Sequence, residues 1–403
     1  MKNAAVSALA VSLLTGPAWA EVEWDVSGFG TLGAVISDSY VHYQRDIDDH
    51  GTLLRDSLAA LQVDVKINDK WSATSQVMLA EALDEDDQFE PQLKWTILSY
   101  RPSNDWLIRL GRMSLGGLLF QQSMDVGVSY DMLRLPAEVY SASRLYDFDG
   151  LSVAKTWDTT DYEITLDVNS GFQDRDYRTY GYGSQQPIFY GADAFAVGMV
   201  LTVTDYGESM LRVGWNYNQV KTDRLMGGSL GFTPIGDDAY TLGASVFTDT
   251  IRVHTLFLGL RFPLGDYMFF FEAMAGLPED IDVFPPAYAG YVTASRRFGQ
   301  WTPYLTLAMV YSDDQGGVLE KLRGATPVPQ LGVSQTILDD LYGTSSYYDQ
   351  QSVMLGLSYA LTVRQKLKAE IMLTHVGEKS LMFDEPISHE NVMIYSLAYS
   401  FMF

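Results

Sequence analysis

The feature that most constrains the fold is a two-residue alternation of apolar and polar side chains, which recurs from residue 23 to the C-terminus. Because successive side chains of a strand point to opposite faces, each such segment predicts a strand with one apolar face. In the second segment Leu61, Val63 and Val65 share one face, while Gln62 and Asp64 share the other. Sixteen segments of this kind are predicted, at 23–38, 55–68, 71–83, 89–101, 105–113, 146–158, 161–172, 190–204, 208–219, 251–262, 266–276, 289–298, 301–311, 349–361, 366–376 and 390–403.

The connections between these segments alternate between short and long. This layout is typical of a transmembrane, antiparallel, up-and-down β-barrel of about 16 strands with short periplasmic turns and long extracellular loops. We therefore predict an all-β chain with both termini in the periplasm; a further hairpin near 240–248 would raise the strand number to eighteen. The short connections are 69–70, 102–104, 159–160, 205–207, 263–265, 299–300 and 362–365, and the long ones are 39–54, 84–88, 114–145, 173–189, 220–250, 277–288, 312–348 and 377–389.

The last strand ends on an aromatic residue. Phe403, Phe401, Tyr399 and Leu397 form one apolar face, and the opposite face is small and weakly polar. A soluble protein seldom exposes such a face, because an apolar edge strand promotes aggregation. The lipid-facing wall of a closed barrel requires it.

Composition agrees with an exported barrel. Residues 1–20 have one lysine, a short apolar run and the sequence Ala-Trp-Ala, which predicts a signal peptide cleaved after Ala20 and a single barrel domain at 21–403. A membrane anchor is the alternative, but the apolar run is short of the roughly 20 residues that span a bilayer. The chain has no cysteine, and its net charge of −24 excludes binding of nucleic acid through a basic patch.

With these features the chain resembles the Gram-negative outer-membrane porins. The resemblance is carried by the signal peptide, the opening VSGFGTLGAV at 26–35, the sixteen segments and the aromatic C-terminus, and the stretch 109–150 is similar to a subgroup of uncharacterised proteobacterial porins. It implies that the C-terminal strand, with Tyr399, Phe401 and Phe403, is the recognition signal for the barrel-assembly machinery. It also implies a homotrimer and a third long loop, here 114–145, that folds into the pore. The acidic PEFGG-type sequence of the general porins is absent from this loop.

A barrel of sixteen strands leaves an aqueous lumen, so selectivity requires something that narrows it. The loop 114–145 is the candidate, because opposed acidic and basic groups across a narrow gap choose solutes by charge and size. The alternative is that the loop lies over the surface as a solvated lid. The predicted constriction residues are Asp125, Asp131, Arg134, Glu138 and Arg144.

The parity of a residue, meaning its odd or even position along the strand, also predicts which charged wall residues face the lumen. Trp95 and Ile97 are expected to face lipid, which turns Lys94 inward, whereas Arg109 and Arg112 have opposite parity and cannot both face inward without a bulge at Gly111. A charged residue on the lipid face near the midplane costs about 2–4 kcal/mol. The charged residues predicted to face the lumen include both acidic and basic side chains, which argues against a dedicated anion channel. The predicted pore-wall residues are Lys94, Arg109, Arg112, Arg212, Lys366, Lys368 and Glu370.

Function is predicted from these elements as passive diffusion of small hydrophilic solutes or ions through an outer-membrane channel. The alternative is a non-conducting structural, adhesin-type or lipopolysaccharide-binding barrel. The sequence has no G-x-S-x-G elbow and no HExxH motif, so no enzyme, cofactor or metal site is predicted. Acidic loop segments at 46–49 and 84–87 could bind divalent cations shared with lipopolysaccharide, but they are more typical of solvated charges.

Overall fold

The computed structural model describes residues 22–114, 116–141, 147–279, 281–314 and 316–403. Within them sixteen antiparallel strands form one closed barrel, which confirms the predicted fold class and strand number. The strands are β1 (Glu23–Ser37), β2 (Leu58–Lys66), β3 (Trp71–Glu81), β4 (Phe89–Tyr100), β5 (Trp106–Ser114), β6 (Asp147–Asp158), β7 (Tyr162–Gly181), β8 (Gln186–Asp205), β9 (Met210–Ser229), β12 (Val246–Leu264), β13 (Tyr267–Pro278), β14 (Ala287–Arg296), β15 (Trp301–Ser312), β17 (Tyr348–Thr362), β18 (Gln365–Ser380) and β19 (Glu390–Met402).

The first and last strands close the barrel. β1 pairs with β19 from Phe29–Met402 to Ser37–Ile394, and the Gly28 and Phe403 backbones exchange hydrogen bonds of 2.9 and 3.1 Å. Gly28 and Gly30 leave room on the outer face for the rings of Phe403 and Phe401. The C-terminal aromatic rings therefore pack directly on the backbone of these two glycines.

The outer face of the barrel is apolar, as the alternation predicts. Leu397, Leu355 and Leu61 are examples of exposed outward side chains on three strands. Near the short turns aromatic rings pair across strands, as in the stack of Trp71 on Tyr100, whose centroids are 4.5 Å apart. Such a band of rings at the edge of an apolar wall is typical of a membrane interface.

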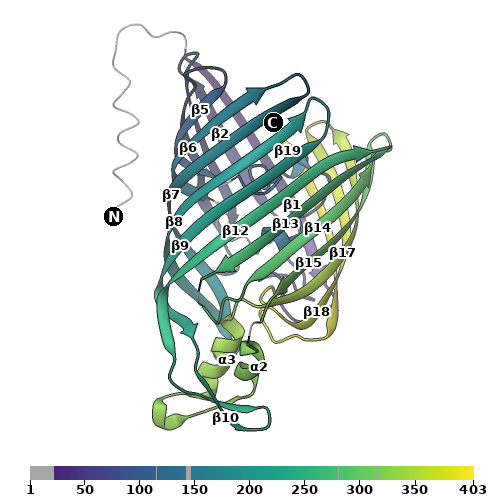
Figure 1. Ribbon diagram of the computed structural model, residues 1–403. Coiled ribbons are helices and arrows are strands. Elements are labelled where there is room, and N and C mark those ends of the chain that lie inside the picture. The colour runs from purple at the N-terminus through teal and green to yellow at the C-terminus, as the bar shows by residue number, and fades with distance from the viewer. Residues whose placement is uncertain (1–21, 115, 142–146, 280, 315) are drawn as a thin grey trace.

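The long connections lie at the opposite end from the short turns (Figure 1). β7, β8, β9 and β12 extend beyond the predicted segments, so part of two predicted loops is strand. A hairpin of β10 (Phe232–Gly236) and β11 (Ala239–Leu242) overlaps only the start of the extra hairpin predicted at 240–248, the end of which belongs to β12. This hairpin joins β16 (Ala325–Thr326) in a separate small sheet outside the barrel, so it does not raise the strand number of the barrel to eighteen. Three helical segments accompany it: α2 (Val318–Arg323), η2 (Pro329–Leu331) and α3 (Gln335–Thr344). No helix among the described residues is long and apolar enough to cross a membrane.

One bulge reverses the predicted parity of β4. Gln76 pairs with Trp95 and Val77 pairs with Leu93, which leaves Lys94 as an extra residue between them. The prediction that Trp95 and Ile97 face lipid is therefore wrong, because one inserted residue exchanges the two faces of the strand beyond it. Ile97 instead packs inside the barrel against Met113 and Phe148.

Candidate channel and constriction

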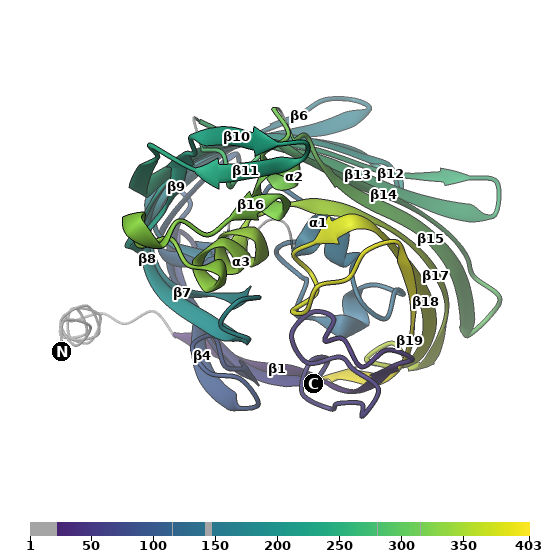
Figure 2. The ribbon, with the colours of Figure 1, turned by 90° about the horizontal axis from the view of Figure 1, so that it is seen from below.

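The segment 116–141 of the third long connection lies inside the barrel rather than over its end. It contains η1 (Gly127–Ser129) and α1 (Ala137–Tyr140), and Figure 2 shows α1 within the ring of strands. Its apolar residues Leu118, Met132 and Val139 belong to the main buried cluster, together with inward residues of the barrel wall. We refer to 116–141 as the inner loop.

Buried polar contacts hold one side of the inner loop against the wall. The Glu272 carboxylate on β13 accepts hydrogen bonds from the Tyr140 and Tyr291 hydroxyls, both at 2.6 Å. Lys368 Nζ on β18 donates to the Gly127 and Met132 carbonyls, also at 2.6 Å. Because these wall groups are buried, they cannot form hydrogen bonds with water, and the inner loop provides their partners instead.

Two predicted sites prove to be anchors of this kind. Glu138 is fully buried and accepts hydrogen bonds from the amide of Gln350, at 2.8 Å, and from the hydroxyl of Ser352 on β17. Glu370 is also buried, and it accepts from the Tyr304 hydroxyl at 2.7 Å. Glu138 therefore does not face open lumen, which corrects its assignment as a constriction residue, and Glu370 faces inward but beneath the loop.

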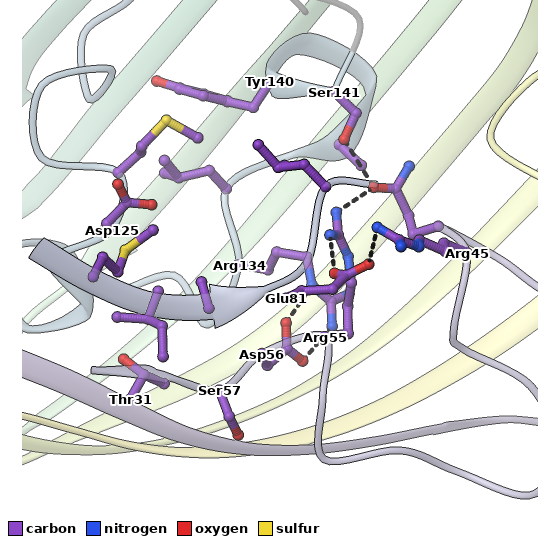
Figure 3. A pocket seen from close by; sticks show the side chains of 18 of the residues that line it. Thr31, Arg45, Arg55, Asp56, Ser57, Glu81, Asp125, Arg134, Tyr140 and Ser141 are labelled. Carbon is purple, nitrogen blue, oxygen red and sulfur yellow. Dashed lines mark hydrogen bonds and ion pairs between the residues drawn. The ribbon is translucent and has the colours of Figure 1, made fainter. Parts of the chain in front are cut away.

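The other side of the inner loop faces a cavity of about 460 Å³. β1 to β4, β7, β17, β19 and the loops 38–57 and 381–389 contribute the rest of its lining. Figure 3 shows part of this lining, including Thr31, Asp56 and Glu81 opposite Asp125 and Arg134 of the inner loop. Basic and acidic side chains are present in nearly equal number. They are Arg45, Arg55, Lys94, Arg134, Arg175 and Arg178 against Asp56, Glu81, Asp125, Asp176 and Asp384.

Ion pairs link these charges across the cavity wall. Arg134 Nε of the inner loop lies 2.9 Å from Asp56 Oδ1, and Lys94 Nζ lies 3.4 Å from Asp125 Oδ2. Figure 3 shows Arg45 and Arg55 converging on Glu81, at 2.8 and 3.0 Å. The loop and the wall thus contribute opposite charges to the same narrow space.

The remaining predicted residues fall in different places. Asp131 pairs with Lys366 at 2.7 Å between the loop and β18. Lys366 and Lys368 both face inward, as parity predicts, but their ammonium groups are engaged by the inner loop. Arg144 lies outside the described residues, as does the predicted signal segment 1–20.

A second cavity of about 250 Å³ lies on the periplasmic side of the inner loop. Arg109 and Arg212 both line it, and Arg109 pairs there with Asp167. Arg212 donates to the Leu118 carbonyl at 2.7 Å, so it also supports the loop. Arg212 occupies the inward position that the alternation predicts, and of Arg109 and Arg112, which have opposite parity, Arg109 is the one that faces inward.

Arg112 does not line the lumen. The pairing of β5 with β6 runs without a register shift through Gly111, so the bulge that would turn Arg112 inward is absent. Its guanidinium instead makes a two-pronged contact of 2.9 and 2.7 Å with Asp149, which is exposed on the outer side beside Phe172. The prediction of Arg112 as a pore-wall residue is therefore corrected.

Several charged residues of the main cavity were missed by the sequence reasoning. Arg178 contacts Asp86 at 2.8 Å and Asp384 at 2.6 Å, and so joins β7 to two loops. Arg178 belongs to β7, but its stretch was predicted as a loop. Arg45 lies in the loop 38–57, where no strand alternation exists to indicate the direction of a side chain. Continuing the alternation of β7 beyond residue 172 turns Arg175 inward, but Arg178 has the opposite parity, so no pattern in the sequence indicated its position. Asp86 is thus paired rather than part of a solvated acidic segment.

The loops 38–57 and 381–389 are joined at the extracellular mouth. Gln44 N donates to the Met382 carbonyl at 2.8 Å, and the His42 ring lies 2.8 Å from Glu385 Oε1. Burial lowers the pKa of His42, but the hydrogen bond and charge of Glu385 outweigh it, so the pKa is raised above its usual value. Burial, together with the charge of Glu81, raises the pKa of Asp46 to about 7.

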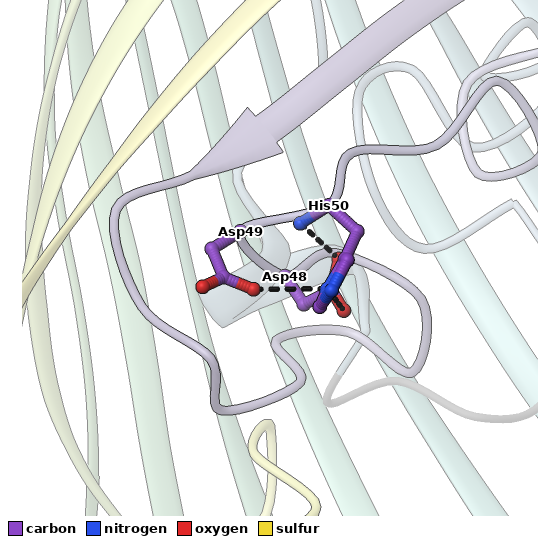
Figure 4. Close-up of side chains that lie close together, drawn as sticks. All are labelled: Asp48, Asp49 and His50. Atoms are coloured by element: carbon purple, nitrogen blue, oxygen red, sulfur yellow. Dashed lines mark hydrogen bonds and ion pairs between the residues drawn. The ribbon is translucent and has the colours of Figure 1, made fainter.

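Asp48, Asp49 and His50 form an exposed group whose ligand atoms lie within 4.8 Å of one another (Figure 4). His50 Nδ1 is 3.0 Å from both carboxylates. These carboxylates and the imidazole ring therefore contact one another at the surface of the loop 38–57.

Comparison with solved structures identifies the architecture. The anion-selective porin of Comamonas acidovorans matches with a TM-score of 0.56 and 12% identity over 95% of this chain and 100% of that chain. The fold is porin-like. The outer-membrane channel DcaP of Acinetobacter baumannii (TM-score 0.55, 11% identity, 94% and 97% coverage) and OmpT of Vibrio cholerae, described as outer-membrane expressed (0.53, 12%, 94% and 98%), share this porin-like barrel. No protein-family model matches the chain, and no curated protein matches it by sequence.

Proposed function

We propose that the protein is an outer-membrane porin that forms a water-filled channel for passive diffusion of small hydrophilic solutes or ions. The observation that carries this proposal is the charged cavity of about 460 Å³ inside a barrel whose outer face is apolar. Charged groups that keep to the lumen of such a barrel are stable only where water or opposite charges reach them.

Passive selection by charge and size follows from the mixed lining. Arg134 and Lys94 face Asp56 and Asp125 at short range, so their fields largely cancel at a distance but act on a solute that passes between them. We therefore expect weak overall charge preference rather than a dedicated anion pathway. Chemistry on the solute is not proposed: among the described residues the ring nitrogens of His42, His50 and His375 face carboxylates or an amide, and no serine hydroxyl bonds to them.

Planar-bilayer recording tests this function directly. Purified, refolded protein should insert and give discrete conductance steps that persist without applied substrate. Insertion without conductance would contradict the channel and favour a sealed structural or lipopolysaccharide-binding barrel.

Location and assembly belong to the same proposal. We infer export by the segment 1–20, insertion into the outer membrane of a Gram-negative bacterium beside lipopolysaccharide, and recognition of Tyr399, Phe401 and Phe403 by the assembly machinery. The exposed C-terminal ring and its seam with Gly28 support the last point. Fractionation of cells that express the intact chain tests the location.

We also propose a homotrimer. In the described part of the chain, pairing of β4 with β5 stops at Thr96–Arg112 and pairing of β6 with β7 stops at Asp149–Phe172. A cavity of about 220 Å³, lined by Arg112 and Asp149, lies at this low point of the wall. Because an outward ion pair is costly in lipid, a neighbouring subunit that covers it would stabilise the barrel. Sedimentation in detergent that found only monomers would contradict this.

A further inference from the structure

A third cavity, which is lined mainly by apolar side chains and is called the chamber below, adjoins the charged cavity. It has a volume of about 160 Å³ and lies between the inner faces of β9, β12 and β13. Val220, Val253, Phe257, Met274 and Phe284 give it apolar walls, and no described residue that lines it is charged. The inner wall of a porin-like barrel is generally polar, so this apolar part of the lumen requires an explanation.

The chamber communicates with the proposed solute route. Tyr177 and Tyr348 line both the charged cavity and the apolar chamber. A solute that reaches the charged cavity therefore meets two tyrosine rings at the boundary of the chamber.

Small residues on β8 lie beside the β9 wall of the chamber. Ala192, Ala194 and Ala196 are buried and face inward, and Gly198 continues this row. A side chain at Gly198 would meet Asn216 Oδ1 at 2.1 Å, so glycine is needed beside this asparagine. Ala194 and Ala196 pair with Val220 and Asn218, which line the chamber.

One polar group in the chamber has no partner. Asn218 on β9 is 3% exposed, lines the chamber, and its Oδ1 accepts no hydrogen bond from the described residues. A buried acceptor without a donor is costly, because it has lost its water and gained nothing in return. A ligand with one hydroxyl group would meet that need.

We propose that this chamber binds a small, neutral, monocyclic aromatic alcohol of the phenol class, with its ring among the apolar walls and its hydroxyl donating to Asn218. A cavity of this size and lining holds a single aromatic ring, and aromatic walls such as Phe257 and Phe284 favour tilted ring contacts. The absence of charge in the lining excludes an ionised solute. The inference deepens the proposed channel function, on which it rests, by naming a class of solute that the channel would retain.

Binding of 4-fluorophenol and fluorobenzene, followed by fluorine NMR with the refolded protein in detergent, tests the proposal. The wild type should bind 4-fluorophenol roughly tenfold more tightly than fluorobenzene, since only the first donates a hydrogen bond. Asn218→Leu should remove this preference and leave fluorobenzene binding unchanged or tighter. Val253→Phe, which fills the chamber, should abolish binding of both probes.

Asn169→Leu is the matched control. Asn169 is also a buried inward asparagine with an unpartnered Oδ1, but it lines the periplasmic cavity instead. This variant should bind both probes as the wild type does, and circular dichroism should show that all variants are folded. Equal binding of the two probes to the wild type, no saturable binding, or equal effects of the two asparagine substitutions would overturn the proposal. Because binding is measured without current, its failure is distinct from the absence of conductance.

Discussion

At the scale of single residues, the acidic and basic side chains of the charged cavity form ion pairs, so the cavity does not carry charge of one sign. Arg134 and Asp56 are both largely buried, with side-chain exposures of 15% and 10%. Removing one member therefore leaves its partner without compensation beside the solute route. The loss of a charge here should act on ions more strongly than the loss of a solvated surface charge.

Arg134→Ala should make the channel more selective for cations. Asp56 then faces the lumen unpaired, and we expect the cation-to-anion permeability ratio to rise about two- to fivefold, equivalent to roughly 0.4–1 kcal/mol. Reversal potentials in a salt gradient measure this ratio. Asp56→Asn should shift the reversal potential in the opposite direction, and a shift of the same sign in both variants would argue against the pairing.

The alternation predicted the inward direction of Arg212 and Lys368 but not what each meets there. It left Arg109 and Arg112 undecided, and Lys94 faces inward although the positions predicted for its neighbours are wrong. Period-two reasoning assigns a face and contains no information on a loop that folds against that face. Glu138 was assigned to the constriction only because it is a charged residue of the loop 114–145, although it is buried against β17. The same reasoning fails beyond a bulge, because nothing in the sequence around Lys94 announces the extra residue.

At the scale of elements, the inner loop is fixed by a few buried polar contacts and by apolar packing on one side. Glu138 joins α1 to β17, and the η1 carbonyl of Gly127 is bound by Lys368. Such contacts hold the loop in one position because breaking them leaves buried donors and acceptors unmet. The width of the channel therefore depends on residues that do not line it.

Glu138→Ala should loosen the inner loop. Gln350 and Ser352 would each lose their acceptor, at a cost of about 1–3 kcal/mol for the buried groups left unpaired. We expect noisier single-channel currents and faster amide hydrogen exchange within 127–141. Glu320→Ala on α2, where the side chain is exposed, is the control and should change neither quantity.

The contact of His42 with Glu385, which joins the loops 38–57 and 381–389, should weaken as pH rises. Because folding raises the pKa of His42, its contribution is complete below the unfolded value near 6.5 and is lost as pH rises through the higher folded pKa. Hydrogen exchange in residues 38–50 should therefore be faster at pH 8 than at pH 6, after correction for the intrinsic pH dependence of exchange. In Glu385→Gln this difference should shrink; an undiminished difference would assign the effect to another group.

The sequence predicted all sixteen barrel strands, since each carries a lipid-facing apolar side. It predicted less well the parts that lie beyond the membrane. The upper parts of β7 and β9 carry charged residues such as Asp174, Asp176 and Arg224 on their exposed face, so their apolar alternation weakens and they were predicted as loops. The small sheet of β10, β11 and β16 depends on contacts between distant segments, which local patterns do not encode.

At the scale of the whole molecule, a barrel is closed only when its first and last strands meet. The last contact of this seam is made by the terminal residue, whose backbone bonds to Gly28 while its ring lies over the same glycine. Closure removes both edges of the sheet, and an open edge in lipid leaves backbone groups unpaired. The seam therefore couples the two ends of the chain to insertion.

Deletion of Phe403 should lower the amount of assembled barrel in the membrane without reducing export. The deletion removes two backbone hydrogen bonds of the seam as well as the ring, whereas Phe403→Ala removes the ring alone and should have a smaller effect. Assembled protein is measured by its resistance to unfolding in unheated gels, and export by the amount of processed chain.

Phe298→Ala is the control for that experiment, because Phe298 is a similarly exposed aromatic residue near a short turn but far from the seam. If loss of any interfacial ring impaired assembly, Phe298→Ala and Phe403→Ala would behave alike. If closure is the sensitive step, only changes at Phe403 should reduce the assembled fraction, and the deletion should do so most. Normal assembly of the deletion variant would mean that the remaining pairs, from Phe29–Met402 to Ser37–Ile394, suffice to close the barrel.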